Sequence, residues 1–582
     1  MGAIKFTNGE ASKEWTVLHP SMAPRVFFLF LQILSLDSTV TLTWKDLSTP
    51  PMDVATSSSS NKHDADRSVK DYNKGQRDPS PAERSIHHGE SDILQGEKVD
   101  EALAAKMMLI NDTIDEIGFT AHHWKLFCLN GFGYAVDSLI LLIQSIISTQ
   151  ARLEFQPGYS TGLTIAVYVG MLVGAIFWGF SADIIGRRFA FNFSLFVSSV
   201  FTIVAGASPS WITLGLFVCL SAFGAGGNLV LDTTVFLEYL PSKEQWLLTL
   251  MAAWWGLGQL IAGLFAWAFL PNYSCSDAAT CTRANNQGWR YVWYTSGALV
   301  FVLSILRITI IRLEETPKFL ISEGEDERGL RVLQNIAKKH NRPCSLTLER
   351  LQACGQIHQR QRAGSSWLAR VISPSEVFFH LRGLFATRKM GLSTTLVWFS
   401  WLLIGLAYPL YNVFLPSYLA SRGASFGESS PYITWRNYAI NNTCSIFGPV
   451  LAGFMCRSPW FWGRRGTMII GAIVTMVFFF CYTQVRTANQ NLGFTCAISF
   501  CLNVYYGTLY AYTPEVFPSA HRGTGNGVAI GLNRIMGIVS AVVGQAANTS
   551  TAVPIYICAA LYIVMAIVAG ALPFEPYGRR SS

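Results

Sequence analysis

The sequence predicts an all-α membrane protein with twelve transmembrane helices in two pseudo-symmetric six-helix bundles. Hydrophobic residues make up 51% of the 582 positions and charged residues only 14%, well below the usual quarter in soluble proteins. Apolar stretches of about twenty residues recur, each long enough to cross a bilayer as a helix. A basic turn at 186–188 followed by Glu238 also recurs 277 residues later, at 463–465 and Glu515. A duplication of this kind is typical of two-halved membrane proteins.

The apolar stretches form two groups of six with a polar gap between them. The expected spans are 125–147, 161–181, 189–207, 211–234, 246–270 and 290–312, then 390–412, 434–456, 466–484, 491–512, 524–546 and 553–573. The polar, serine-rich N-terminal stretch is too poor in apolar residues to build a core. The chain therefore divides into a disordered tail (1–122), an N-terminal bundle (123–312), a central loop (313–389), a C-terminal bundle (390–573) and a short tail (574–582).

Basic side chains gather in the loops on one side of the predicted membrane. The central loop and both repeated turns fall on this side, so the positive-inside rule makes it cytoplasmic, together with both termini. The formal charge of +8 fits loops facing an anionic leaflet. No basic stripe with interleaved aromatic residues appears, so we expect a lipid bilayer and no nucleic acid as partner.

Enzyme chemistry finds no support in the sequence. No paired nucleophile and base, phosphate-binding loop or metal-ligand spacing stands out, so we expect no catalytic residues, cofactor or metal. Cys275 and Cys281 share a polar loop on the outer side, where a disulfide is possible. Asn272 and Asn548 begin glycosylation patterns on that side, close to the membrane surface.

Several motifs resemble those of the major facilitator superfamily. The stretch 179–188 is similar to its signature between the second and third helices, with Asp183 before the turn. Residues 314–319 and 512–518 look like segments of the sugar-porter branch. The stretches 117–137, 226–238 and 254–259 are similar to the synaptic-vesicle-protein-2-related transporters. The resemblance covers about 111–575 and implies the two-bundle fold, alternating access and a monomer.

The resemblance also implies a cytoplasmic ion network that holds the two halves together. Its expected members are Asp183, Arg187, Arg188, Asp232, Glu238, Glu314, Glu315, Arg464, Arg465, Glu515 and Arg522. The second repeat departs from the pattern because Trp460 stands where an acid is expected. Glu515 is therefore predicted to be the main partner of Arg464 and Arg465.

Three charged residues stand out among the few inside the predicted spans, where an ionisable group is costly unless it is paired or hydrated. Asp137 is a candidate for proton coupling, and the alternative is a structural aspartate paired with a neighbouring helix. Arg534 is suited either to a substrate carboxylate or to pairing with Asp137 or Asp232. Asp232 is expected to be structural, joining Glu238 in the ion network.

Further cavity residues are expected on the seventh and tenth spans, which line the cavity in this superfamily. Tyr408, Tyr411 and Asn412 surround Pro409, which marks a bend, and Asn503 and Tyr506 lie on the tenth span.

The function predicted from these features is secondary transport of a small organic solute, such as an organic acid, together with protons. Two alternatives remain open: export of a natural product or drug by the same fold, and a non-transporting sensor or trafficking protein. The resemblance to this branch favours a location in the plasma membrane.

Overall fold

The computed structural model describes residues 101–159, 161–311, 314–356, 374–421, 431–546 and 553–576, all within one compact unit. The first six long helical segments are α4 (Ala121–Phe155), α5 (Gly162–Ile184), α6 (Arg187–Gly206), α7 (Trp211–Tyr239), α8 with α9 (Trp246–Leu250 and Ala253–Tyr273) and α10 (Gly288–Leu306). The second six are α16 (Arg388–Ser421), α17 (Pro431–Arg457), α18 (Gly463–Tyr482), α19 (Ala488–Val516), α20 (Arg522–Ala546) and α21 (Val553–Ala571).

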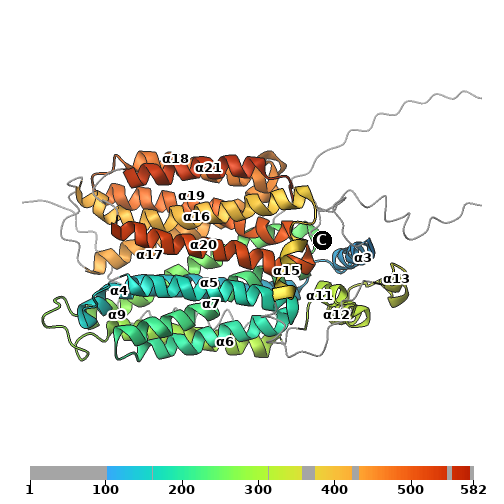
Figure 1. The fold of residues 1–582 in the computed structure, drawn as a ribbon, viewed down its shortest axis with the longest axis horizontal. Helices are drawn as coiled ribbons and strands as arrows, with labels where there is room; N and C mark the ends of the chain where they lie inside the picture. The colour runs from blue at the N-terminus through green and yellow to red at the C-terminus, as the bar shows by residue number, and fades with distance from the viewer. Residues whose placement is uncertain are drawn as a thin grey trace, which may run out of the picture. The chain divides into compact units, whose positions relative to one another are not determined.

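These helices match the predicted spans in number and order. Eleven of the described helical segments are long and apolar enough to cross a membrane. The twelfth is α21, whose apolar part was assessed over the shorter stretch Ile555–Ala571. Figure 1 shows α4–α9 grouped on one side and α16–α21 grouped on the other. The chain is therefore a multi-pass membrane protein built from two six-helix halves.

Small residues allow helices to approach closely within and between the halves. A Cβ on Gly170 or Gly174 of α5 would lie 2.2 Å from a backbone carbonyl of α7. Between the halves, a Cβ on Gly179 of α5 would lie 3.0 Å from Cα of Gly527 in α20. Because lipid removes the hydrophobic drive for helix association, such close backbone packing supplies much of the attraction.

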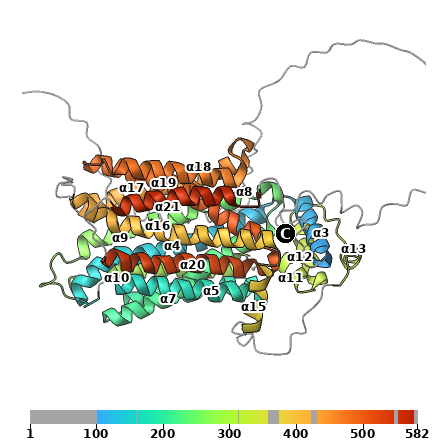
Figure 2. The same ribbon diagram turned by 45° about the horizontal axis from the view of Figure 1, so that its top comes forward.

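Short helices cover one end of the bundle, which we call the basic-turn end because the turns before Arg187 and Arg464 lie there. They are α3 (Glu101–Ile117), α11 (Pro317–Ser322), α12 (Asp326–Lys339), α13 (Leu348–Gln352), α15 (Pro374–Gly383) and the single turns η2 (Ser242–Glu244), η4 (Pro459–Phe461) and η5 (Ser519–His521). Both views show α3, α11, α12 and α13 together at this end (Figures 1 and 2).

Helix α3 corrects the prediction that residues 1–122 are disordered. Residues 1–100 lie outside the described part, but 101–117 form a helix with an apolar stripe of Met107, Ile110, Ile114 and Ile117. This stripe packs against α11, α12 and α13 in a small separate core. The segment orders because its apolar residues recur at helical spacing, although they are few.

Candidate functional site

Two buried charges from different halves meet near the middle of the bundle. Nη2 of Arg534 in α20 lies 2.8 Å from Oδ2 of Asp137 in α4, and both side chains are nearly inaccessible. The other carboxylate oxygen of Asp137 has no hydrogen-bond partner among the described residues. Of the alternatives open for Arg534, the structure contains the internal pair with Asp137. The pair joins the two halves across their interface.

Aromatic side chains surround this pair, mainly from the second half. The phenols of Tyr168, Tyr506 and Tyr510 lie close enough to Arg534 to interact with it electrostatically. Tyr506 stacks on Tyr510 and meets the ring of Tyr408 edge-on. Gln259 of α9 donates from Nε2 to the hydroxyl of Tyr408 at 3.5 Å, which adds a cross-half contact. The pair and its aromatic shell form the central site.

Tyr510 is the hub of this shell, and the sequence analysis did not identify it. Its ring contacts those of Tyr134, Trp255 and Trp401 at centroid distances of 5.8, 5.9 and 4.7 Å. Four consecutive helical turns of α19 carry several aromatic residues, and the sequence alone does not show which of them faces the other half. This layer closes the central site on the side toward the basic-turn end.

The predicted cavity residues divide into two groups. Tyr408 and Tyr506 lie in the central site, and their contact with substrate stays a prediction. Tyr411 instead packs against Phe479 and Tyr482 of α18, inside the second half.

Of the two predicted asparagines, Asn503 does not contribute to the central site. Asn503 donates to the carbonyl of Ser499 in its own helix, and its Cβ faces Gly448 of α17. The side chain of Asn412 lies outside the described residues.

The prediction that Asp232 joins Glu238 in the ion network is wrong. Asp232 of α7 forms a buried ion pair with Arg307 in η3 (Arg307–Ile311), one π-helical turn after α10. Arg307 also donates to the carbonyl of Phe191 at 3.0 Å and covers the ring of that residue. Arg307 was not singled out because a basic residue near the end of a predicted span is ordinary. Its side chain is buried because it points inward to Leu129 of α4, Phe191 of α6 and Asp232 of α7.

The first copy of the repeated motif forms a buried ion cluster. Arg187 lies 3.3 Å from Asp183 and 3.2 Å from Glu238, with all three side chains almost fully buried. Glu315 accepts hydrogen bonds from the backbone N–H groups of Arg187 and Arg188 at 2.8 and 3.2 Å, which caps the start of α6. Burial raises the pKa of Glu315, and Arg187 with these N–H groups counteracts the rise.

This cluster also joins the two halves. Asp183 accepts from the backbone N–H groups of Gly523 and Thr524 at 3.2 and 2.7 Å, so it caps α20 from the other half. Arg187 donates to the carbonyl of Ser519 at 2.8 Å. Arg522 reaches Glu238 at 3.6 Å. We call these cross-half contacts the latch.

The second copy pairs differently from the prediction. Arg464 forms an ion pair with Glu515, as expected, but Arg465 donates to the carbonyl of Gly570. Glu575, which the sequence analysis missed, accepts from the backbone N–H groups of Arg464 and Arg465, both at 3.1 Å. Glu575 thus repeats the capping role of Glu315. The spacing between these two glutamates is 260, not 277, so comparison at the repeat offset could not find it.

The second copy has Trp460 in place of the expected acid, and its contacts with the opposite half come from another residue. Trp460 is 88% exposed and takes no part in the latch. The cross-half contacts of this copy come from Arg464, which donates to Thr249 and to the carbonyl of Gln245 in the first half. The two copies therefore share the arginine–glutamate pair and differ in how they reach the opposite half.

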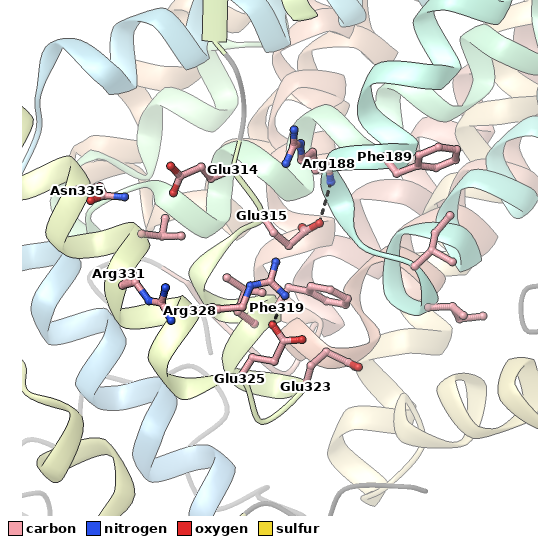
Figure 3. Close-up of a pocket in the computed structure, with 14 residues that line it drawn as sticks. Arg188, Phe189, Glu314, Glu315, Phe319, Glu323, Glu325, Arg328, Arg331 and Asn335 are labelled. Atoms are coloured by element: carbon pink, nitrogen blue, oxygen red, sulfur yellow. Dashed lines mark hydrogen bonds and ion pairs between the residues drawn. The ribbon is translucent and has the colours of Figure 1, made fainter. Parts of the chain in front are cut away.

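Two of the predicted network residues lie at the edge of the cluster. Arg188 and Glu314 are exposed and line a cavity of about 670 Å³ between the α5–α6 turn and helices α11 and α12. Figure 3 shows this cavity, with Glu315 turned toward the backbone at Arg188. Neither side chain belongs to the buried cluster.

The opposite end of the bundle carries a disulfide and a further ion pair. Cys275 and Cys281 are joined between α9 and α10. Nearby, Glu154 at the end of α4 pairs with Arg290 at 2.7 Å, an interaction the sequence analysis did not predict. Asn272 is exposed at the end of α9, whereas Asn548 lies outside the described residues. Within the described ranges, no group of three or more metal-ligating side chains is present.

Comparison with known proteins identifies the family. The model described as Major Facilitator Superfamily matches residues 126–541. The chain belongs to this superfamily. Its fold and its resemblance to the synaptic-vesicle-2-related branch are confirmed, and it is a transporter rather than an enzyme.

Individual major facilitator proteins support this assignment. The MFS siderochrome iron transporter 1 of Ceriporiopsis subvermispora is 41% identical over 87% of this chain and 97% of its own length. The niacin transporter NiaP of Acinetobacter baylyi is 26% identical over 74% and 88%. The synaptic vesicle 2-related protein of Rattus norvegicus is 25% identical over 81% and 82%. Among solved structures, the proton:xylose symporter XylE with 6-bromo-6-deoxy-D-glucose has a TM-score of 0.54, with 14% identity, covering 79% of this chain and 98% of its own.

Proposed function

We propose that this major facilitator protein carries a small organic acid across the plasma membrane together with protons. The observation that supports this most is the Asp137–Arg534 pair across the two halves. A buried ion pair is expensive to break, because removing one partner leaves an uncompensated charge. Any step that separates the halves must therefore supply new partners for both groups.

A proton and a substrate carboxylate together meet this requirement. Protonation of Asp137 removes its charge, and the guanidinium of Arg534 then needs another anion. A carboxylate suits the guanidinium because it can accept two parallel hydrogen bonds. The surrounding tyrosines and Gln259 supply hydrogen-bonding groups and apolar surface for the rest of the solute. Loading one partner without the other leaves a buried charge unpaired, which couples the two fluxes.

The latch supports an assignment of state and orientation. Its buried contacts close the basic-turn end, so alternating access requires the contacts of Asp183, Arg187 and Arg522 across the halves to break. The positive-inside rule places this end in the cytoplasm, together with both termini. In this proposal the conformation is closed toward the cytoplasm, and the transporter works as a monomer.

A second candidate substrate class is the siderochromes, because one relative is named MFS siderochrome iron transporter 1. A bulky iron chelate with acidic groups could use the same Arg534 anchor. Its larger size would require more of the aromatic shell to move. The uptake experiment therefore compares a small aromatic acid with an iron-loaded siderochrome.

The test is uptake by the purified full chain in vesicles with an imposed pH gradient. Nicotinate and an iron-loaded siderochrome are the acidic probes, and nicotinamide is the neutral control for nicotinate. We expect accumulation of an acidic probe only with the gradient, and a loss of at least about tenfold in Arg534→Gln. Equal effects of Arg534→Gln on the uptake of acidic and neutral probes would show that Arg534 does not bind the anionic group of the substrate. Gradient-independent export of apolar compounds would favour efflux, and no flux of any probe class would favour a sensor.

A further inference from the structure

The face of α4 that carries Asp137 continues toward the basic-turn end as a row of buried polar groups. Asn130, Tyr134 and Asp137 are spaced i, i+4 and i+7, so they share one face of the helix. Each has an exposed fraction of 0%. Even so, both amide atoms of Asn130 and the hydroxyl of Tyr134 have no hydrogen-bond partner among the described residues. The same is true of Oδ1 of Asp137.

Asp232 extends this row from the neighbouring helix α7. A Cβ on Gly133 would lie 1.7 Å from Oδ2 of Asp232, so this carboxylate rests directly against α4 where only glycine fits. That oxygen also has no hydrogen-bond partner within the described part of the chain. Tyr134 directly follows Gly133 in α4 and lies about one helical turn before Asp137, and both carboxylates act on it electrostatically.

Buried polar atoms without partners are costly, and native proteins satisfy such groups with ordered water. Here five such atoms, from four residues, belong to one continuous row. A purely structural role would be served as well by leucine and phenylalanine. The charges facing the row are Arg534 from α20 and Arg307 from η3, and Tyr510 of α19 packs on the ring of Tyr134.

We propose that Asn130, Tyr134 and Asp232 hold a chain of water molecules that takes the proton from Asp137 and carries it toward the basic-turn end. This inference rests on the proposed function, because it assumes that Asp137 accepts a proton. It adds Tyr134 as a relay, Asn130 as a positioning residue for water, and Asp232 as a second acceptor.

The transfer balances in protons and charge. The O–H bond of the Asp137 acid breaks as an O–H bond forms on the oxygen of Tyr134, directly or through water. The original proton of Tyr134 moves to the carboxylate of Asp232. Asp137 becomes a carboxylate paired with Arg534, while Asp232 becomes neutral beside Arg307. Release of that proton to water at the basic-turn end restores the Asp232–Arg307 pair.

Infrared spectroscopy of the full chain in lipid nanodiscs can test the relay without knowledge of the substrate. The carboxylic acid band of Asp137 is assigned by its loss in Asp137→Asn, and its shift in D2O then reports how fast protons reach it. We expect exchange to be at least about tenfold slower in Tyr134→Phe than in the unmodified chain, with a similar effect in Asn130→Leu. The matched control is Tyr411→Phe, which removes another buried, unpartnered hydroxyl away from the row.

The outcomes separate the two proposals. Equal exchange rates in Tyr134→Phe and the unmodified chain would overturn the relay and leave proton coupling by Asp137 intact. If no acid band of Asp137 appears between about pH 4 and about pH 8, either without solute or with nicotinate or the iron-loaded siderochrome present to pair with Arg534, Asp137 takes no proton and both proposals fail. Should Asn130→Leu not fold, Tyr134→Phe alone decides, because phenylalanine keeps the ring that packs on Tyr510.

Discussion

Individual charged residues show what the sequence could and could not predict. Asp137 and Arg534 were identified because charges are rare in apolar spans, and most members of the ion cluster because they belong to the repeated motif or to the family resemblance. Apart from Glu515 with Arg464, their partners could not be fixed, because pairing depends on which faces of the helices meet. Asp232 was therefore grouped with Glu238 from the sequence, whereas its partner in the structure is Arg307. Glu575 was missed because it lies outside the repeat spacing, although it caps a helix in the same way as Glu315.

Glu575 and Glu315 should contribute about equally to the stability of the folded chain. Each accepts two backbone N–H groups at a helix start, so we expect Glu575→Gln and Glu315→Gln each to lower stability by about 1–2 kcal/mol. Thermal unfolding in detergent measures this. Glu314→Gln, at the exposed neighbour of Glu315, is the control and should change stability by less than about 0.5 kcal/mol. If Glu575→Gln leaves the stability unchanged, the helix cap formed by Glu575 does not contribute to stability as the cap formed by Glu315 does.

The Asp232–Arg307 pair should behave as a buried unit. Asp232→Asn or Arg307→Met alone leaves one buried charge unpaired, which costs about 3–5 kcal/mol. The double variant removes both charges and should recover at least half of the lost stability. Folded yield and melting temperature of the four proteins form a double-mutant cycle. Strictly additive losses would contradict direct pairing.

Secondary-structure elements were predictable wherever apolar runs were long. The twelve spans appear in order, and the prediction failed only for shorter elements. Helix α3 was assigned to a disordered tail because its apolar residues are few, and only the fold shows that α11, α12 and α13 cover them. In the structure, α3 contacts both halves, through Ser242 in the first and Ser519 in the second.

The attachment of α3 can be measured at one contact. Asp115 accepts from the backbone N–H of Ser242 at 2.7 Å and from its hydroxyl at 2.8 Å, which fixes α3 to η2. We expect Asp115→Ala to cost about 1–2 kcal/mol, and Ser242→Ala less, because the backbone N–H remains. In a double-mutant cycle by thermal unfolding, the two changes should couple by about 1 kcal/mol. Independent effects would show that the Asp115–Ser242 hydrogen bonds do not hold α3 in place.

At the scale of the whole molecule, the two halves meet tightly at the basic-turn end. The duplication predicted two halves, but not that Gly179 and Gly527 would bring their backbones into contact. That approach, with the latch, explains why the asymmetry of the repeats is tolerated. Asp183 caps α20 in one copy, and Arg464 reaches the opposite half in the other.

Enlarging one of these glycines should open the basic-turn end. A Cβ on Gly527 already lies 2.8 Å from the carbonyl of Ala175, so Gly527→Leu is incompatible with the closed contact. Ser181, fully buried two residues after Gly179 in α5, serves as a reporter when changed to cysteine. Thiol labelling there should accelerate by about tenfold or more. Gly493→Leu, at a glycine with open space around it, should leave labelling unchanged. Unchanged labelling in Gly527→Leu would show that this end does not gate access.

The central claim is that Asp137 and Arg534 couple proton and substrate movement across the interface of the halves. The most direct measurement compares exchange and accumulation of the transported acid in vesicles containing Asp137→Asn. Exchange needs no net proton transfer, whereas accumulation driven by a pH gradient does. We predict that Asp137→Asn retains exchange within about threefold of the unmodified chain and loses gradient-driven accumulation entirely. Accumulation by Asp137→Asn to the level of the unmodified chain would contradict the claim.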